Sequence, residues 1–389
     1  MRVSRRFSGI AESATLKMGR LAKELKAQGK PVVDFTLGEP DFDTPQHIKE
    51  AARRALDEGH THYTQAAGIP ELREEIASRL NEDYGLDVRA DDVLVTPGAK
   101  HAIYEAFMAI LDAGDAVILV EPAWVSYAAA ARLAGGEVVW TKRFADRREE
   151  VTYERLEKVF TPKAKILVIN SPNNPVGYVL SKKELEEIAE FAKDKNLLVL
   201  SDEIYSKIIY EREHICFATL DGMTERTILV DGFSKTYAMT GWRVGYAVAP
   251  PEILNAMLKV QQHSVTCATS FAQFGALAAL RDERSKESLK EMVAEFKRRR
   301  DLIVEGLQKL GLRCERPDGA FYVFVNVETA GMDGETFAEK ALREFYVATT
   351  PGSAFGPSCG GYVRFSYATS TESIREGLQR LGRMLEGNA

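Results

Sequence analysis

Short apolar runs alternate with amphipathic segments along the first two thirds of the chain. Runs such as Val93-Leu94-Val95-Thr96 predict buried strands, whereas residues 71–80 and 101–111 carry apolar side chains at helical spacing. Ser181-Lys182-Lys183-Glu184 is a capping box that predicts the start of a further helix. Strands that alternate with helices predict an α/β fold with a mainly parallel sheet, which binds ligands outside the carboxyl ends of its strands. The predicted strands of this region are 93–96, 117–120, 138–140, 166–169, 197–200, 227–230 and 244–248.

The pattern changes after residue 280. A long charged helix is predicted over residues 286–310, strands over 320–325 and 362–367, and a terminal helix after residue 374. A chain of 389 residues is too long for one ordinary core. We therefore expect a large domain and a smaller α+β domain, with these bounds: 45–280 for the large one, 1–44 and 281–389 for the small one.

Composition indicates a soluble globular protein, with 45% hydrophobic and 28% charged residues. The net charge of −6 argues against nucleic acid as a partner, because nucleic-acid binders need a basic surface. The basic run Arg298-Arg299-Arg300 lies in a helical segment of mixed charge and is predicted to be a solvated face. No apolar run is long enough to cross a bilayer, so no membrane partner is expected.

Cysteine usage predicts a reducing compartment. Cys216, Cys267, Cys314 and Cys359 stand far apart and form no CxxC pair, which indicates reduced thiols and a cytoplasmic location. The first residues are not followed by a long apolar core, so a secretory signal is not expected. The six histidines form no HExxH motif, and no metal site is predicted.

Polar residues stand at the ends of several predicted strands, where an α/β sheet binds its ligands. They are the segment 170–174, Asp202, and Ser234-Lys235. The turn Pro97-Gly98-Ala99-Lys100 lies between a strand and a helix, a pattern that can bind an anion through free backbone amides. Many such turns bind nothing, so this signal is weak by itself.

Lys235 is the most informative of these residues. It lies between two apolar strands, and a lysine there is seldom kept unless its amine is used, although an ordinary loop lysine is the simpler alternative. Burial and neighbouring cations lower the pKa of a lysine, so that its neutral amine can attack a carbonyl and form a Schiff base. Ser234 and Arg243 nearby suit a phosphate. Together they indicate a phosphorylated aldehyde cofactor, pyridoxal phosphate.

Pyridoxal chemistry also needs an acid, ring contacts and a carboxylate site. Asp202 could hold the ring nitrogen protonated, Tyr205 and Asn174 could reach the ring oxygen, and Trp124 could stack on the ring. Arg364 on a strand could pair with a substrate carboxylate. Each also has an ordinary alternative: a helix cap, a turn asparagine, a packed aromatic or a surface salt bridge.

Five segments together resemble class I aminotransferases. They are GEPDFDTP from residue 38, NSPNNPVG from 170, SDEIY from 201, SKTYAMTGWRVGY from 234 and YVRFSYAT from 362. They follow the family's order and span nearly the whole chain. The resemblance implies the pyridoxal-phosphate fold type I, a homodimer with active sites at the subunit interface, and amino acid and 2-oxo acid substrates.

The resemblance also implies roles for individual residues. Lys235 is expected to be the Schiff-base lysine and proton carrier, and Asp202 the partner of the ring nitrogen. Asn174 and Tyr205 are expected at the ring hydroxyl and Trp124 on the ring face. The residues expected at the cofactor phosphate are Gly98, Ala99, Lys100, Ser234 and Arg243. Tyr63 is expected to reach the phosphate bound by the neighbouring subunit. Gly38 and Arg364 are expected to contact the substrate α-carboxylate.

The segment Glu12-Ser13-Ala14-Thr15 and the turn at Lys100 resemble the prokaryotic aspartate aminotransferase branch. There a lysine at this turn meets the distal carboxylate of aspartate or glutamate, whereas a solvated lysine at a helix start is the alternative for Lys100. We therefore expect amino transfer from L-aspartate to 2-oxoglutarate, giving oxaloacetate and L-glutamate. The nearest alternative is an aromatic amino acid or prephenate aminotransferase, and a β-lyase is a further one. A ligand-sensing regulator or a dimer without chemistry fits less well.

Overall fold

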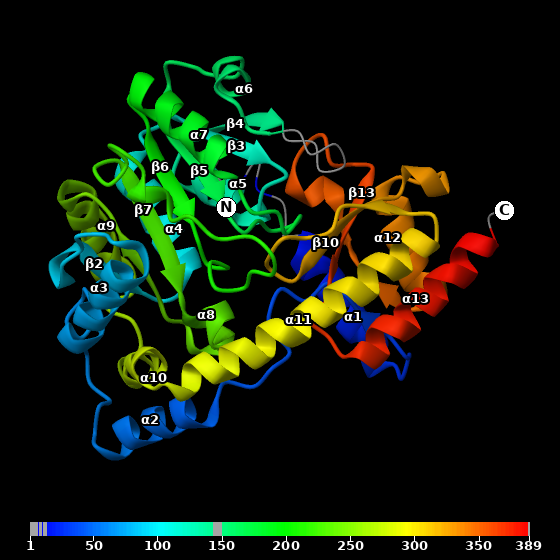
Figure 1. Ribbon diagram of the computed structural model, residues 1–389, viewed down its shortest axis with the longest axis horizontal. Coiled ribbons are helices and arrows are strands. Elements are labelled where there is room, and N and C mark those ends of the chain that lie inside the picture. Colours follow the sequence, from blue (N-terminus) through cyan, green and yellow to red (C-terminus); the bar gives the residue numbers. More distant parts are fainter. Residues whose placement is uncertain (1–6, 8–9, 11–13, 143–149, 388–389) are drawn as a thin grey trace, which may run out of the picture.

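A seven-stranded sheet forms the centre of the larger part of the molecule (Figure 1). The computed structural model describes residues 7, 10, 14–142 and 150–387. Strands β3 to β7 pair in parallel, whereas β8 runs antiparallel to both of its neighbours, β2 and β7. The predicted mainly parallel α/β sheet is therefore confirmed. Its order is β2 (Val93–Thr96), β8 (Gly245–Val248), β7 (Thr227–Gly232), β6 (Leu198–Asp202), β5 (Ala164–Asn170), β3 (Ala116–Glu121) and β4 (Glu137–Lys142).

Helices cover both faces of this sheet because its strands carry apolar side chains on both sides. Val117 and Leu119 pack toward one helical layer, whereas Ile118 and Val120 pack toward the other. The first layer consists of α4 (Ala99–Ile110), α5 (Val125–Leu133) and α9 (Pro251–Ser264). The second consists of α7 (Lys182–Asp194), which begins with the predicted capping box at Ser181, and of α3 (Pro70–Tyr84) and α10 (Ser270–Arg281).

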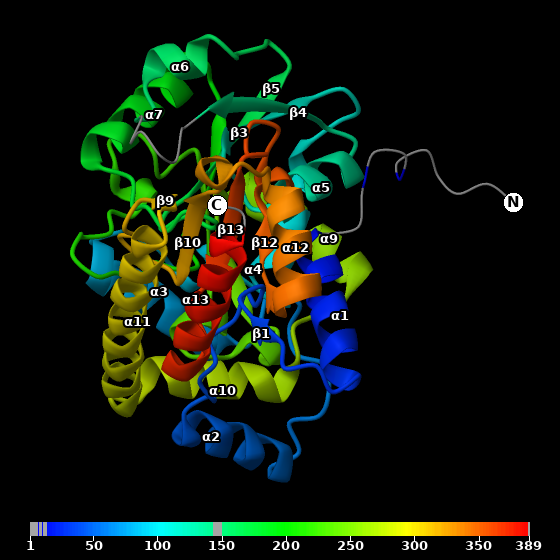
Figure 2. The ribbon, with the colours of Figure 1, turned by 90° about the vertical axis from the view of Figure 1, so that its right-hand side faces the viewer.

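The smaller part of the molecule is built on a four-stranded antiparallel sheet. A two-stranded parallel pair joins the N-terminal segment to it, because β1 (Val33–Asp34) pairs with β11 (Val347–Ala348). In Figure 2, α1 (Ala14–Ala27), α12 (Gly334–Phe345) and α13 (Thr371–Glu386) flank these strands. The four strands, in order, are β12 (Thr350–Pro351), β13 (Tyr362–Ser366), β10 (Tyr322–Asn326) and β9 (Arg313–Cys314).

Helix α11 (Arg284–Lys309) runs from the large sheet's helices to the smaller part (Figure 1). Helix α2 (Gln46–Asp57) packs on α10, and α6 (Tyr153–Glu157) on α7. The sequence pattern did not indicate α6, α9 or α10. The predicted helix over 101–111 starts earlier, at Ala99, because Gly98 lets the chain turn directly into the helix. The apolar spacing of Leu16, Leu21 and Leu25 also predicts a helix over residues 13–26; residue 13 lies outside the described residues, and α1 spans Ala14–Ala27.

The prediction of a solvated face for Arg298-Arg299-Arg300 was wrong for two of the three residues. Arg298 is exposed, but Arg299 and Arg300 are buried. Arg299 pairs with Asp41 at 2.7 Å, and Arg300 forms a forked pair with Glu211. These two arginines point inward because carboxylates from distant segments pair with them. The alternation of charges along the helix does not reveal such partners.

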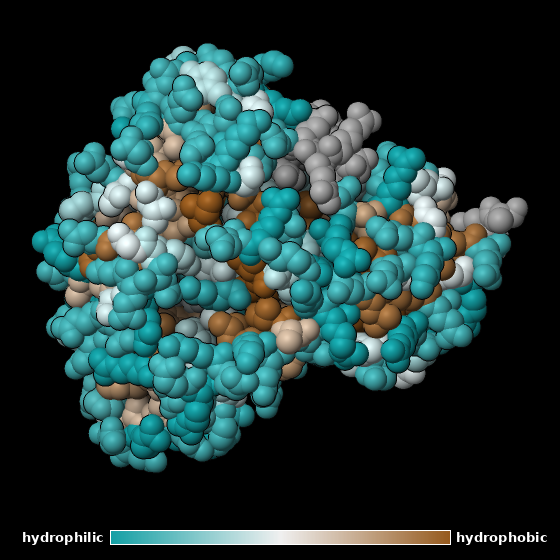
Figure 3. Space-filling model, in the orientation of Figure 1, coloured by the Kyte–Doolittle hydropathy of each residue, from teal (hydrophilic) through white to brown (hydrophobic). Residues whose placement is uncertain are grey.

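Hydrophilic residues cover most of the face in Figure 3, and hydrophobic ones show mainly in recesses between elements. None of the helices in the described ranges is long and apolar enough to span a membrane. Among the described residues, the exposed large hydrophobic side chains are Phe7, Leu56, Tyr63 and Val265.

Candidate active site

A cavity of about 880 Å³ lies where the carboxyl ends of the large sheet's strands meet the smaller part of the molecule. It is lined by residues separated by up to 345 positions in the chain, from Gly19 to Arg364. Most side chains expected at the active site line it together. They are Gly38, Ala99, Lys100, Trp124, Asn174, Asp202, Tyr205, Ser234, Lys235, Arg243 and Arg364.

Lys235 sits in the short helix α8 (Phe233–Thr236), which follows β7 directly. Its Nζ donates a hydrogen bond to the carbonyl of Gly38 at 2.6 Å. Burial lowers the pKa of the Lys235 amine to about 8, although Glu39 opposes this, while Arg243 and Lys100 add to it by repulsion. An amine with this pKa is partly neutral near pH 8 and can act as a nucleophile or a base.

Asp202 ends β6 and is buried beside the cavity. Its Oδ2 accepts a 2.6 Å hydrogen bond from the hydroxyl of Tyr127, and its Oδ1 accepts one from the Ile204 N–H. Burial raises the pKa of the Asp202 carboxyl to about 6, whereas these two hydrogen bonds lower it. A buried carboxylate held in this way suits a cationic ring nitrogen.

The N-terminus of α4 offers an anion site at the same edge. Gly98 has φ of 88°, and a Cβ there would lie 2.6 Å from the guanidinium of Arg243. The glycine therefore leaves room for the Arg243 guanidinium, which donates to the Pro97 carbonyl at 3.3 Å, beside the start of α4. Ser234 is buried at the same cavity. Amides, a hydroxyl and a guanidinium together form a site for a phosphate.

Arg364 lies on β13 and is 1% exposed, so it is not part of a surface salt bridge. It donates to the side-chain oxygen of Asn174 at 3.0 Å and to the carbonyl of Thr36 at 2.8 Å. Within the described ranges its Nε is buried without a partner. The hydroxyls of Tyr205 and Tyr322 are 2.8 Å apart beside it. Such a cation with an unused donor can bind a carboxylate.

Lys100 and Trp124 meet at another wall of the cavity, where the Lys100 Nζ lies 4.9 Å from the centre of the Trp124 ring. Burial, reinforced by Arg243, lowers the pKa of Lys100. The residue is nevertheless solvent-exposed, so its binding of a distal carboxylate stays a prediction beside the solvated lysine considered from the sequence. Tyr63, by contrast, is 85% exposed and does not line the cavity.

Several residues that contact the site were missed from the sequence. Tyr127 and Tyr322 were given no role, and Asn170 was noted only as the first residue of the polar segment 170–174. Glu39 and Thr240 lie in the segments that we singled out, but we gave them no role; their side chains are 2.8 Å apart. The position of Tyr127, one helical turn after Trp124, is the one sequence signal that could have identified it.

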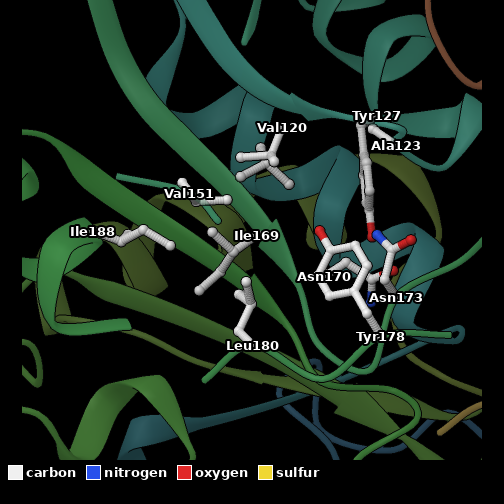
Figure 4. Close-up of a pocket in the computed structure, with 11 residues that line it drawn as sticks. Val120, Ala123, Tyr127, Val151, Ile169, Asn170, Asn173, Tyr178, Leu180 and Ile188 are labelled. Atoms are coloured by element: carbon white, nitrogen blue, oxygen red, sulfur yellow. The ribbon is translucent and has the colours of Figure 1, made fainter. Parts of the chain in front are cut away.

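A second, much smaller cavity lies behind the site (Figure 4). Its volume of about 10 Å³ holds at most one water molecule. Asn170, Asn173, Tyr127 and Tyr178 cluster on one side of it, and apolar side chains such as Ile169 fill the other. This cavity is too small for a substrate, but Tyr127 and Asn170 on its polar side also line the main cavity.

Comparisons with known proteins agree with this geometry. The family model for aminotransferase class I and II matches residues 30–381. An aspartate aminotransferase of Pyrococcus abyssi is 46% identical over 93% of this chain and 94% of its own. Aromatic-amino-acid aminotransferase 2 of Thermococcus litoralis is 41% identical over 99% of both chains.

The solved structure of a Thermus thermophilus aspartate aminotransferase with maleate is also similar. Its TM-score is 0.95 at 44% identity, covering 98% of this chain and all of that one. These matches confirm the expected family, the fold type I and the pyridoxal-phosphate cofactor. The chain belongs to the class I and II aminotransferase family and is a pyridoxal-phosphate-dependent enzyme.

Proposed function

We propose that this enzyme transfers the amino group of L-aspartate to 2-oxoglutarate, giving oxaloacetate and L-glutamate. The observation that carries the proposal is that Lys100 and Arg364 line the cavity that holds Lys235, in addition to Arg243 at the proposed phosphate site. Aspartate and glutamate have two carboxylates, and two cations that share a cavity with a reactive amine suit such a molecule. The similar aspartate aminotransferases support this choice.

The residues present fit pyridoxal phosphate. The Gly98 turn, Ala99, Ser234 and Arg243 would hold the phosphate, because a side chain at residue 98 would displace the guanidinium. Asp202 would hold the proton on the ring nitrogen, and Trp124 would stack on the ring. Asn174 and Tyr205 would lie at the ring hydroxyl. Bound there, the cofactor supplies an aldehyde that condenses with amines and a ring that takes up negative charge.

Each residue of the site has its own role in the proposed reaction. The Lys235 amine, neutral in part near pH 8, would take the α-proton of the substrate and deliver it to the carbon that the cofactor's aldehyde contributes, on the other side of the substrate nitrogen. Arg364 binds the α-carboxylate together with the Gly38 segment, and Lys100 binds the distal carboxylate. Asp202, kept in place by Tyr127, maintains the charge that makes the ring an electron acceptor.

The second candidate is an aminotransferase for aromatic amino acids or prephenate. The position of Lys100 over the Trp124 ring gives this rival a specific basis, because an aromatic side chain could occupy the same wall. The similar Thermococcus enzyme also supports it. The two candidates share the fold, the cofactor and Lys235. They differ in whether a distal carboxylate or an aromatic side chain of the substrate lies at Lys100.

A half-reaction experiment distinguishes them. The cofactor-bound enzyme is mixed separately with aspartate, glutamate, phenylalanine and tyrosine, without an amino acceptor. We expect aspartate and glutamate to change the visible absorbance of the cofactor at far lower concentrations than the aromatic amino acids. A preference for the aromatics would move the assignment to the rival. Lys235→Ala should lose both turnover and the visible band, and full activity of this variant would refute the proposed mechanism.

We also propose the assembly, domain division and location that the resemblance implies. In a homodimer, the exposed ring of Tyr63 would reach the phosphate of the neighbouring subunit. The division into residues 45–280 and the two flanking segments is supported by two hydrophobic cores that lie wholly within 45–280. Two other cores cross the division, with Ile204 in one and Phe324 in the other. A cytoplasmic location fits the four free cysteines.

A further inference from the structure

Asn170 occupies a special place because it ends β5 beside Asp202, which ends β6. The two residues are register partners at the carboxyl edge of the sheet. Asn170 is buried and lies in the polar cluster of Figure 4, behind the main cavity that it also lines. Its side chain has one amide donor group and one acceptor, and both are directed at the backbone of proposed active-site residues.

The donor and the acceptor hold two different segments. The Asn170 Nδ2 donates to the Asp202 carbonyl at 2.9 Å, and its Oδ1 accepts from the Asn174 N–H at 2.8 Å. Asn174 in turn accepts from Arg364 at 3.0 Å through its own side chain. The Asn170 amide thus links Asp202, proposed to contact the ring nitrogen, to Asn174, whose side chain holds Arg364.

We infer that Asn170 is a positioning residue that fixes the ring contact and the carboxylate contact relative to each other. This inference rests on the proposed function, since it assumes that Asp202 and Arg364 serve the cofactor and the substrate. The two hydrogen bonds of the Asn170 side chain both go to backbone groups of the protein. Its burial makes the two hydrogen bonds hard to replace by water, so their loss lets both segments move.

Asn173 provides a matched control in the same turn. It is also buried and also holds backbone groups through both ends of its amide, namely the Pro122 carbonyl at 3.4 Å and the Val176 N–H at 3.1 Å. Neither bond involves Asp202, Asn174 or Arg364. Truncating Asn173 therefore costs a comparable pair of hydrogen bonds without releasing the two active-site segments.

The experiment compares Asn170→Ala and Asn173→Ala as holoenzymes. Two quantities are measured from the cofactor absorbance: the pH midpoint of the visible band and the dissociation constant of maleate, an unreactive dicarboxylate. We expect Asn170→Ala to move the midpoint by about half a pH unit or more and to raise the dissociation constant of maleate roughly tenfold. Asn173→Ala should leave the pH midpoint unchanged and the dissociation constant of maleate within about twofold of the wild-type value, whatever its melting temperature.

Asn170→Asp separates the two ends of the amide. The carboxylate keeps an acceptor for the Asn174 N–H but loses the donor to the Asp202 carbonyl. We expect it to keep most of the maleate affinity while still shifting the pH midpoint. Unchanged midpoint and affinity in Asn170→Ala would overturn the inference, as would equal changes in Asn173→Ala. A wild-type enzyme without a visible band would instead remove the proposed function and this inference together.

Discussion

The hydroxyl of Tyr127 lies 2.6 Å from the Oδ2 of Asp202, and both side chains are buried. A phenol that donates to a carboxylate favours its charged form and lowers its pKa. In the part of the chain that the structure describes, the Ile204 N–H is the other hydrogen-bond donor to this carboxylate. Tyr127 therefore keeps Asp202 ionised in surroundings that would otherwise favour the neutral acid.

Tyr127→Phe should therefore raise the pKa of Asp202. A hydrogen bond to a charged group is worth about 1.5–3 kcal/mol, which corresponds to a shift of about one to two pH units. We expect the acidic limb of the aspartate half-reaction to move to higher pH by that amount. Tyr153→Phe is the control, since its hydroxyl bonds to Asp194 at the exposed surface. A limb that stays in place would show that Tyr127 only packs against the site.

The rate at which the cofactor-free enzyme takes up pyridoxal phosphate should rise with pH through about 8. Only the neutral amine of Lys235 attacks the aldehyde, and burial lowers its pKa to about 8. Lys100→Ala should move this midpoint upward, because the Lys100 cation helps to lower the pKa of Lys235. The measurement is the growth of the visible band after rapid mixing. A midpoint that moves downward in the variant would contradict this electrostatic account.

Lys100→Ala should also change substrate preference. If Lys100 binds the distal carboxylate, its loss lowers kcat/KM for aspartate by about 10- to 100-fold, because a charge-assisted bond is lost. Phenylalanine, which has no such carboxylate, should change by less than about threefold. Lys165→Ala serves as the control, since that side chain is exposed on β5. An unchanged ratio of aspartate to phenylalanine activity would remove the proposed role of Lys100.

The buried carboxyl of Asp231 should make the cofactor-free protein less stable as pH rises. Burial raises the pKa of Asp231 to about 7, so the folded state holds a proton that the unfolded state releases near pH 4. This contribution is full below about pH 4 and is lost as the pH rises toward 7, with an upper limit of about 4 kcal/mol.

Asp231→Asn should remove that part of the pH dependence. The amide keeps an acceptor for the Gly232 N–H and can still pair with the Ser206 hydroxyl. We expect the melting temperature of the variant to fall less between pH 5 and pH 8 than that of the wild type. Asp221→Asn, on an exposed carboxylate, should follow the wild-type curve. Parallel curves for the wild type and Asp231→Asn would refute the expectation.

The positions of the large sheet's strands along the chain, most of its helices and the main chemical groups of the site could be predicted from the sequence, whereas α6, α9 and α10 could not. Burial on both faces of a parallel strand needs a continuous apolar run, and the turn before α4 needs glycine at residue 98, so both leave local signals. The segments around Lys235, Asp202 and Arg364 could be identified for the same reason: each places a polar residue at the end of, or within, a strand that is otherwise apolar.

The tertiary structure alone decided which of these groups meet and what holds them. The bonds from Asn170 to Asp202 and from Arg364 to Asn174 join residues 32 and 190 positions apart. The burial of Arg300 likewise depends on Glu211, which is 89 positions away. Such contacts follow from strand order and helix packing, which bring distant segments together, and no local periodicity encodes them. Hence the sequence indicated the reactive groups, whereas the roles of Tyr127 and Asn170 emerged only from the fold.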